Sequence, residues 1–339
     1  MRRTMYGVSF RHVLLFALFS MAVACMAEKG GAETSPAPEQ GSDTQMTFKS
    51  ISPPYLDYEY FEHHERYPFQ RDAEQFSIIN AWWLVESAIL AYADKEFAAK
   101  QFHLAGFDGV RFFTGRSTQC YVASNKKFAI VAFRGSETLS RLKSEDAENV
   151  FADLIIDLKI RQTQWRGGGK VHRGFKEALD EVWHQLSKYV AGLHLEGGQI
   201  WLTGHSLGAA LATLAADRLR GVQNVYAFGS PKVGNAAFQN LFKDHAYQIV
   251  NNADIVTKLP PGYGYTHVGE TWLIDRSGRL GHETKSADPL ATQTIEIEDM
   301  DIGAFTADML SSFTDHIPLY YAAHIRHALP DGTANNGKR

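Results

Sequence analysis

The chain has 339 residues, of which 45% are hydrophobic and 21% are charged, which is an ordinary composition for a globular protein. A formal net charge of −4 and the lack of a basic stripe in the sequence argue against a nucleic-acid partner. The sequence holds only two cysteines, Cys25 and Cys120, so a disulfide framework cannot support the fold.

The first 24 residues have the features of an export signal. Three arginines near the start precede a twelve-residue apolar run at 13–24, which is too short to span a bilayer. Ala22-Val23-Ala24 forms an A-x-A cleavage motif, and Cys25 follows it directly. The segment resembles a bacterial lipoprotein signal, in which this cysteine becomes the lipidated N-terminus and anchors the protein to a membrane. The alternative is plain secretion with an incidental Cys25.

The rest of the chain divides into a tether, one domain and a tail. Residues 25–46 are rich in Gly, Ser, Pro and Glu, so we expect a disordered tether. Residues 47–330 contain no second linker and no internal repeat, which predicts a single domain. We expect 331–339 to form a disordered tail. Within the domain, the Glu62-His63-His64-Glu65 cluster is more typical of a solvated surface than of a metal site.

The first half of the domain shows one clear helix and one clear strand. Apolar side chains at helical spacing predict a helix over 75–92. Residues 128–133 (FAIVAF) are all apolar, as expected for a strand buried on both faces. Two weaker predictions follow: a polar, helix-compatible segment at 139–150 and a strand at 151–160.

The second half alternates strands with helices. A helix that begins near Phe175 leads into an apolar strand that starts at Gln199, and a second helix covers about 207–220. Further apolar strands are predicted at 225–228 and 247–250. This alternation implies an α/β fold with a mostly parallel central sheet and helices on both faces, and catalytic groups then lie beyond the carboxyl ends of the strands.

The sharpest motif is Gly204-His205-Ser206-Leu207-Gly208, which has the form G-x-S-x-G between a strand and a helix. Such a turn strains the backbone of the serine and projects its hydroxyl away from the chain. Glycines at 204 and 208 avoid collisions with the neighbouring strand and helix. Ser206 is therefore predicted to be a nucleophile at a nucleophile elbow.

A serine nucleophile needs a histidine as base and a carboxylate to orient it. Asp254 follows the strand at 247–250, whereas Asp217 lies on the nucleophile helix and Asp244 precedes its strand. Among the later histidines, His316 stands at the start of the terminal helix, while His324 and His327 lie within it and His282 lies in a polar loop. The order Ser206, Asp254, His316 is the chain order of α/β-hydrolases.

The motifs around these residues resemble the class 3 lipases, a family that includes the filamentous-fungal triacylglycerol lipases. The matching segments follow the family's order over about 190 residues: FRGSET (133–138), VHRGF (171–175), LTGHSLGAALA (202–212), FGSPKVGN (228–235), NNADIVTKLPP (251–261), GYTHVGETW (264–272) and DHIPLYY (315–321).

The resemblance implies an α/β-hydrolase fold and a serine carboxyl-ester hydrolase that acts on acylglycerols or other lipid esters. It implies Ser206 as nucleophile, with Asp254 and His316 completing the triad. The amides of Ser136 and Leu207 would form the oxyanion hole. It makes His172 and His267 structural, and it requires neither a metal nor a cofactor.

Two departures and two alternatives accompany this resemblance. The fungal lid carries a tryptophan, whereas 139–150 is charged and has no aromatic residue, so interfacial activation does not follow. The segment 275–313 has no assigned role. A phospholipase A1 or a lysophospholipase is the alternative within the enzymes, and a catalytically silent surface binding protein is the alternative outside them.

Overall fold

The computed structural model describes residues 53–136, 161–219, 221–260, 264–282 and 314–330. The chain forms two units, Met1–Gln45 and Met46–Arg339, and all of the described residues belong to the second. The predicted export signal, the whole tether, the polar segment 139–150, the strand at 151–160 and the tail lie outside the described residues.

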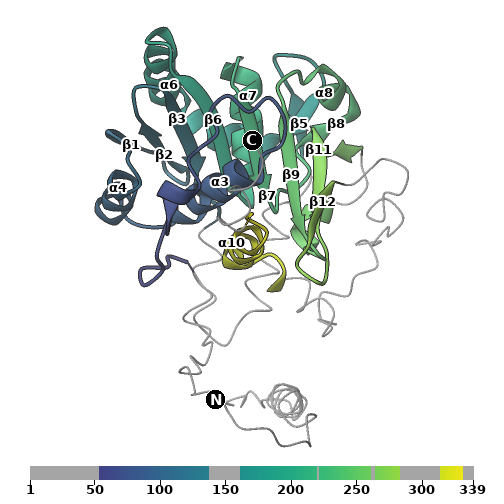
Figure 1. The fold of residues 1–339 in the computed structure, drawn as a ribbon. Coiled ribbons are helices and arrows are strands. Elements are labelled where there is room, and N and C mark those ends of the chain that lie inside the picture. The colour runs from purple at the N-terminus through teal and green to yellow at the C-terminus, as the bar shows by residue number, and fades with distance from the viewer. Residues whose placement is uncertain (1–52, 137–160, 220, 261–263, 283–313, 331–339) are drawn as a thin grey trace, which may run out of the picture. The chain divides into compact units, whose positions relative to one another are not determined.

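A single large sheet forms the centre of the domain (Figure 1). In the described residues its strands occur in the order β1-β2-β3-β6-β7-β9-β11-β12. Their bounds are β1 (Gly109–Thr114), β2 (Gln119–Ser124), β3 (Phe128–Phe133), β6 (Gln199–His205), β7 (Asn224–Phe228), β9 (Ala246–Asn251), β11 (Glu270–Ile274) and β12 (Leu280–His282).

The middle of this sheet is parallel and its two margins are antiparallel. Strands β3, β6, β7, β9 and β11 pair in parallel, while β1 and β2 at one margin and β12 at the other pair antiparallel. Phe133 lies opposite Gly204, and His205 lies opposite Phe228. The loops after β3, β6, β7 and β9 therefore converge at one edge, as the predicted strand–helix alternation requires.

Helices cover both faces of the sheet. On one face, α3 (Ile78–Leu90) packs against β6 and β3, and α10 (Pro318–His327) packs against α3 (Figure 1). On the other face, α6 (Arg173–Leu195) and α7 (Leu207–Leu219) cover β6 and its neighbours. Strand β6 is buried from both sides, because Trp201 belongs to the core under α3 while Ile200 and Leu202 belong to the core under α7.

Smaller elements complete the described part of the domain. A second, antiparallel sheet has the order β10-β8-β5-β4, from β10 (Tyr265–Thr266), β8 (Gly234–Asn235), β5 (Lys170–His172) and β4 (Gln162–Gln164). The remaining helices are α4 (Lys95–Leu104), α8 (Ala236–Leu241) and the short helices η1 (His64–Arg66) and η3 (Ile255–Lys258).

The main predicted elements are present with small shifts at their ends. The predicted helix 75–92 is α3, which starts at Ile78 because the Ser77 hydroxyl accepts the amide of Asn80 and caps it. The predicted strand 128–133 is β3, and every residue in it is buried. The α/β fold with a mostly parallel sheet is confirmed.

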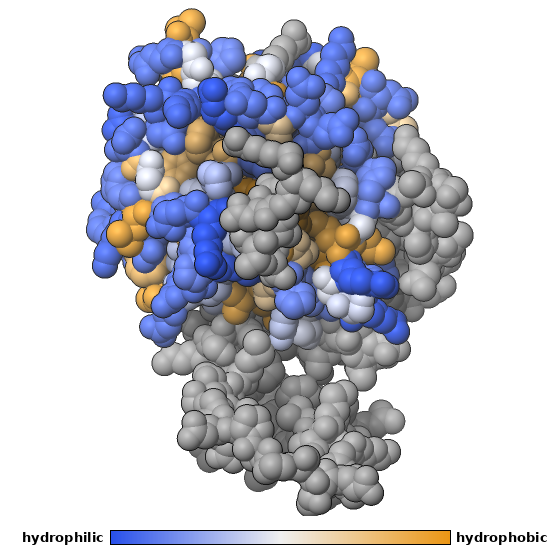
Figure 2. Space-filling view, viewed as in Figure 1, coloured by the Kyte–Doolittle hydropathy of each residue, from blue (hydrophilic) through white to orange (hydrophobic). Residues whose placement is uncertain are grey.

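The outer surface is mostly hydrophilic on the face shown in Figure 2. Among the described residues, the exposed large hydrophobic side chains come from separate parts of the chain: Leu56, Leu104, Leu195 and Leu241. Within the described ranges, no helix has both the length and the apolar character that a membrane span requires.

Candidate active site

Ser206 lies at the sharp turn between β6 and α7. Its φ of 58° is in the left-handed region, which non-glycine residues rarely adopt. The two flanking glycines make the turn possible: a Cβ on Gly204 would collide with Gly208, and one on Gly208 would collide with the Phe133 carbonyl. The local geometry is that of a nucleophile elbow.

Three residues from distant parts of the chain meet at this turn. His316 Nε2 lies 2.9 Å from Ser206 Oγ, and His316 Nδ1 lies 2.8 Å from Asp254 Oδ2. A carboxylate only accepts hydrogen bonds, so Nδ1 carries the proton and Nε2 accepts the serine hydroxyl. All three side chains are buried. In this tautomer His316 is ready to receive the serine proton.

Asp254 occupies the loop after β9 and is held by three donors. Its Oδ1 accepts the amide of Val256 at 2.9 Å, and its Oδ2 accepts both His316 Nδ1 and the Tyr321 hydroxyl at 2.6 Å. The Tyr321 hydroxyl in turn accepts the amide of Asn251 at 3.0 Å. These hydrogen bonds fix the orientation of the carboxylate and satisfy its acceptor oxygens, which are buried away from water.

The loop that carries His316 is tied to the loop that carries Asp254. The Asp315 carboxylate accepts the Asn252 side-chain amide at 2.8 Å and the Ala253 amide at 3.1 Å. Burial raises the pKa of Asp315, although both of these hydrogen bonds lower it. The Asn251 side chain adds a bond to the Asp315 carbonyl at 2.9 Å. The backbone segments that carry Asp254 and His316 are therefore also held together by hydrogen bonds.

His205, the residue before the nucleophile, lies directly beside His316. Their ring centroids are 4.5 Å apart, and His205 Nε2 donates to the His316 carbonyl at 2.8 Å. Burial lowers the pKa of His205 well below its usual range, and the nearby His316 lowers it further. His205 is therefore neutral and cannot place a second positive charge beside His316.

The two residues expected to donate to an oxyanion lie on the segments that border Ser206. Leu207 opens α7 immediately after the nucleophile, and Ser136 lies in the loop that follows β3. These segments pack closely, because a Cβ on Gly208 would lie 2.9 Å from the Arg134 carbonyl oxygen. Both backbone segments are therefore near the serine, as the predicted oxyanion hole requires.

Sequence reasoning missed three residues at this site: Tyr321, Gly229 and Tyr92. Gly229 has a φ of +57°, and a Cβ there would lie 2.8 Å from Asp254 Oδ2 and 3.0 Å from His316 Nδ1. Tyr92 bonds to the His205 ring at 3.1 Å. Tyr321 stands close to His316 in the DHIPLYY segment and Gly229 stands in FGSPKVGN, whereas the Tyr92 contact arises from packing alone.

The other polar candidates have structural partners. His172 caps α6 by accepting the Phe175 amide at 3.3 Å, and His267 bonds to the Thr257 carbonyl at 2.7 Å. Asp217 accepts the indole of Trp165 at 2.6 Å. No group of three or more metal-ligating side chains occurs in the part of the chain that the structure describes.

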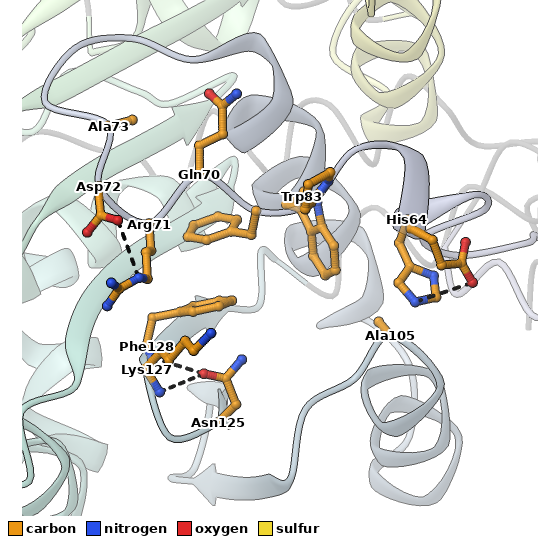
Figure 3. A pocket seen from close by; sticks show the side chains of 13 residues that line it. His64, Gln70, Arg71, Asp72, Ala73, Trp83, Ala105, Asn125, Lys127 and Phe128 are labelled. Carbon is orange, nitrogen blue, oxygen red and sulfur yellow. Dashed lines mark hydrogen bonds and ion pairs between the residues drawn. The ribbon is translucent and has the colours of Figure 1, made fainter. Parts of the chain in front are cut away.

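One cavity lies near the start of β3 (Figure 3). Its volume is about 680 Å³, and Phe69, Trp83 and Phe128 form its aromatic walls. Phe128 begins β3, whereas the triad lies where the strands end. None of the triad residues lines this cavity. The candidate active site is therefore identified by hydrogen-bond geometry and not by the size of a pocket.

Comparisons with known proteins agree with this geometry. Residues 130–264, which include Ser136, Ser206 and Asp254, match the family model described as Lipase (class 3). A lipase from Rhizomucor miehei is 32% identical over 169 residues, which cover 45% of this chain and 44% of that protein. A secreted mono- and diacylglycerol lipase from Malassezia restricta is 30% identical over 197 residues, which cover 53% and 60%. The chain thus spans about half the length of these curated relatives.

A solved structure shares the fold. The triacylglyceride lipase of Rhizomucor miehei superposes with a TM-score of 0.51 at 24% identity, over 70% of this chain and 94% of that one. This likeness concerns the arrangement of the sheet and its helices. The chain therefore has an α/β-hydrolase fold, and its residues 130–264 are similar to the class 3 lipases.

Proposed function

We propose that the protein is a serine carboxyl-ester hydrolase that acts on acylglycerols or related lipid esters. The observation that carries the proposal is the continuous hydrogen-bonded row from Ser206 Oγ through His316 to Asp254. Burial of all three groups strengthens their electrostatic interactions, because little water screens them. The names of the relatives, which are lipases, support the same reaction class.

The reaction follows from the positions of these groups. Ser206 Oγ attacks the ester carbonyl carbon while His316 Nε2 takes its proton, and Asp254 stabilises the imidazolium that forms. The tetrahedral intermediate collapses when His316 returns the proton to the leaving alcohol, which leaves an acyl-enzyme. Water, activated by the same histidine, then releases the acid.

The developing negative charge needs donors that are in place before the reaction begins. The backbone amides of Ser136 and Leu207 are assigned this role, since both lie on segments that border Ser206. Loss of one such donor costs about 3 kcal/mol in the barrier. The amide of Leu207 has the further advantage of the α7 N-terminus, where the helix dipole favours negative charge.

The direct test uses a fluorophosphonate probe and the Ser206→Ala variant. The probe should label the wild type at Ser206 and leave the variant unlabelled, and hydrolysis of short acyl nitrophenyl esters should disappear in the variant. Ester hydrolysis by Ser206→Ala at the wild-type rate would refute the assignment, as would a folded wild type with no esterase activity. The second result would favour the silent binding protein.

The lipid class is tested by comparing tributyrin, a triolein emulsion and phosphatidylcholine as substrates. We expect the acylglycerols to be preferred, in keeping with the names of the relatives. Release of the sn-1 acyl chain from phosphatidylcholine, in preference to acylglycerol hydrolysis, would support a phospholipase A1. A preference for lysophosphatidylcholine would support a lysophospholipase.

We infer further that the chain is exported and anchored to a membrane through a lipidated Cys25. The sequence of residues 1–25 supports this proposal, and the secreted relatives support export in general. Cys25→Ala should move the protein from the membrane fraction to the soluble fraction without changing its esterase activity. Continued membrane association of Cys25→Ala would exclude lipidation as the cause.

A further inference from the structure

Two buried residues outside the triad connect its base to the loop after β3. The Tyr92 hydroxyl lies 3.1 Å from His205 Nδ1, and His205 Nε2 lies 2.8 Å from the backbone carbonyl of His316. Tyr92 is 4% exposed and His205 is fully buried. Water is therefore a poor substitute for either hydrogen bond.

The direction of both bonds can be assigned. A carbonyl oxygen only accepts, so His205 Nε2 carries the proton and donates to His316. His205 Nδ1 is then an acceptor, and the Tyr92 hydroxyl must donate to it. Burial raises the pKa of Tyr92, which keeps this proton on the hydroxyl at neutral pH. Tyr92 thus selects the tautomer of His205 that can bind the loop of the catalytic base.

Tyr92 also contacts the loop that carries the expected oxyanion donor. A Cβ on Gly135 would collide with the Tyr92 hydroxyl and would lie 2.7 Å from the His205 carbonyl oxygen. Gly135 immediately precedes Ser136, whose amide is assigned to the oxyanion hole. The same hydroxyl therefore touches the loop after β3 and orients the ring that holds His316.

We propose that Tyr92 and His205 are positioning residues. They hold the catalytic base, His316, and the loop after β3 (residues 134–136) in the correct positions relative to Ser206. The proposal rests on the ester hydrolysis proposed above and assigns these two residues a task within it. Neither side chain exchanges a proton with the substrate. They act by fixing the backbone of His316 and of residues 134–136, and a small misplacement of such groups lowers the rate of the chemical step.

The first test is Tyr92→Phe, which removes one hydroxyl and adds no atoms. We expect kcat for a short acyl nitrophenyl ester to fall about tenfold while KM changes less than about twofold. The matched control is Tyr226→Phe, since the Tyr226 hydroxyl accepts the Ser77 amide at 2.9 Å, at the opposite end of α3. The control also loses a buried hydrogen bond of a tyrosine hydroxyl, here one in which the hydroxyl accepts, and should keep the wild-type kcat.

The second test compares two replacements of His205. His205→Gln keeps an N–H that can donate to the His316 carbonyl, whereas His205→Phe keeps the ring shape and loses both hydrogen bonds. We expect His205→Gln to retain at least about tenfold more activity than His205→Phe. Since the two residues act as a unit, adding Tyr92→Phe to His205→Gln should lower kcat less than it does in the wild type.

The results separate this proposal from the proposed function. If the wild type hydrolyses esters and Tyr92→Phe matches Tyr226→Phe in both kcat and KM, the positioning role is wrong and the hydrolase assignment stands. Equal activity of His205→Gln and His205→Phe, with both folded by circular dichroism, would also overturn it. If the wild type neither hydrolyses esters nor reacts with the fluorophosphonate, the proposed function itself fails, and the role assigned to this pair fails with it.

Discussion

Tyr321 and His316 donate to the same oxygen of Asp254, at 2.6 Å and 2.8 Å. His316 precedes α10 and Tyr321 lies within it, so one short segment supplies both the base and a second donor to the acid. The Tyr321 hydroxyl also accepts the amide of Asn251 at the end of β9. Burial, together with the charge of Asp254, raises the pKa of Tyr321 well above its usual range, so this hydroxyl remains a donor.

Tyr321→Phe should therefore weaken both catalysis and stability. Asp254 loses a donor, and the buried Asn251 amide loses its acceptor, which costs about 1–3 kcal/mol of unfolding free energy. We expect kcat to fall about fivefold as Asp254 becomes less well oriented. Tyr226→Phe is the control, because the Tyr226 hydroxyl likewise accepts a buried backbone amide, that of Ser77, away from the triad. Urea unfolding and steady-state kinetics measure both effects, and equal kcat values for the two variants would contradict the expectation.

Gly229→Ala should disable the site through a direct collision. The new Cβ would lie 2.8 Å from Asp254 Oδ2 and 3.1 Å from His316 Cε1, so the Asp–His pair must move. A displacement of that pair by about 1 Å lowers kcat about 100-fold. Gly221→Ala provides the control, since Gly221 also has a positive φ, of +69°, but nothing lies within 4 Å of its Cβ position.

Both variants carry the same kind of backbone strain. They should therefore lose similar amounts of unfolding free energy from that strain, about 1 kcal/mol each, while only Gly229→Ala loses activity. An active Gly229→Ala enzyme would show that the Asp–His pair tolerates the extra methyl group.

Replacements of Ser206 should reveal the energetic cost of the elbow. Its φ of 58° is unfavourable for any residue with a Cβ and is accessible to glycine. Ser206→Ala and Ser206→Gly should both be inactive, but the glycine variant should be the more stable of the two by about 1 kcal/mol. Chemical denaturation of the two variants measures this difference. Equal stability would mean that the elbow is not strained at this residue.

Glu86 predicts a pH dependence of stability that is independent of the triad. Its carboxyl group accepts the Tyr58 hydroxyl at 2.6 Å and the Phe61 amide at 3.3 Å, and burial raises its pKa to about 7 despite these bonds. Because the folded state holds this proton more tightly than the unfolded state, stability falls as the pH rises from about 4.5 to about 7, by about 3 kcal/mol in total. Glu86→Gln should remove this fall.

Glu181→Gln is the control, because the effect of Glu181 on the pH dependence of stability has the opposite sign to that of Glu86. Burial opposes ionisation of Glu181, but hydrogen bonds from Ser117 and Thr118 outweigh it and lower the pKa. Its contribution to stability is therefore present above its unfolded pKa and is lost as the pH falls. Unfolding curves between pH 4 and pH 8 would distinguish the two variants. A Glu86→Gln protein with the wild-type pH dependence would exclude Glu86 as the source.

The sequence predicted Ser206, Asp254 and His316 as a triad from local patterns and from their order along the chain. Ser206 has its G-x-S-x-G turn, and Asp254 follows an apolar strand at a sheet edge. The strand 128–133 could also be predicted from the sequence, since a run of six apolar residues is typical of a strand buried on both faces. The structure brings these segments together as the chain order of Ser206, Asp254 and His316 suggested.

The rest required the packed structure. The Tyr92–His205 contact joins residues 113 positions apart, and Tyr92 looked like one more apolar member of a helix. Gly229 belongs to the FGSPKVGN segment, but its closeness to Asp254 depends on how β7 and β9 pair. The strands of the small sheet have two or three residues each, which is too short for alternation to appear in the sequence.

The segment that supplies His316 and Tyr321 is the last described part of the chain. During synthesis, Ser206 and Asp254 are therefore made well before the base that activates them. A chain that stops before residue 316 carries a nucleophile with no proton acceptor, whatever else of the domain has folded. Under the proposed function, ester hydrolysis therefore begins only when α10 packs into place and brings His316 to Ser206.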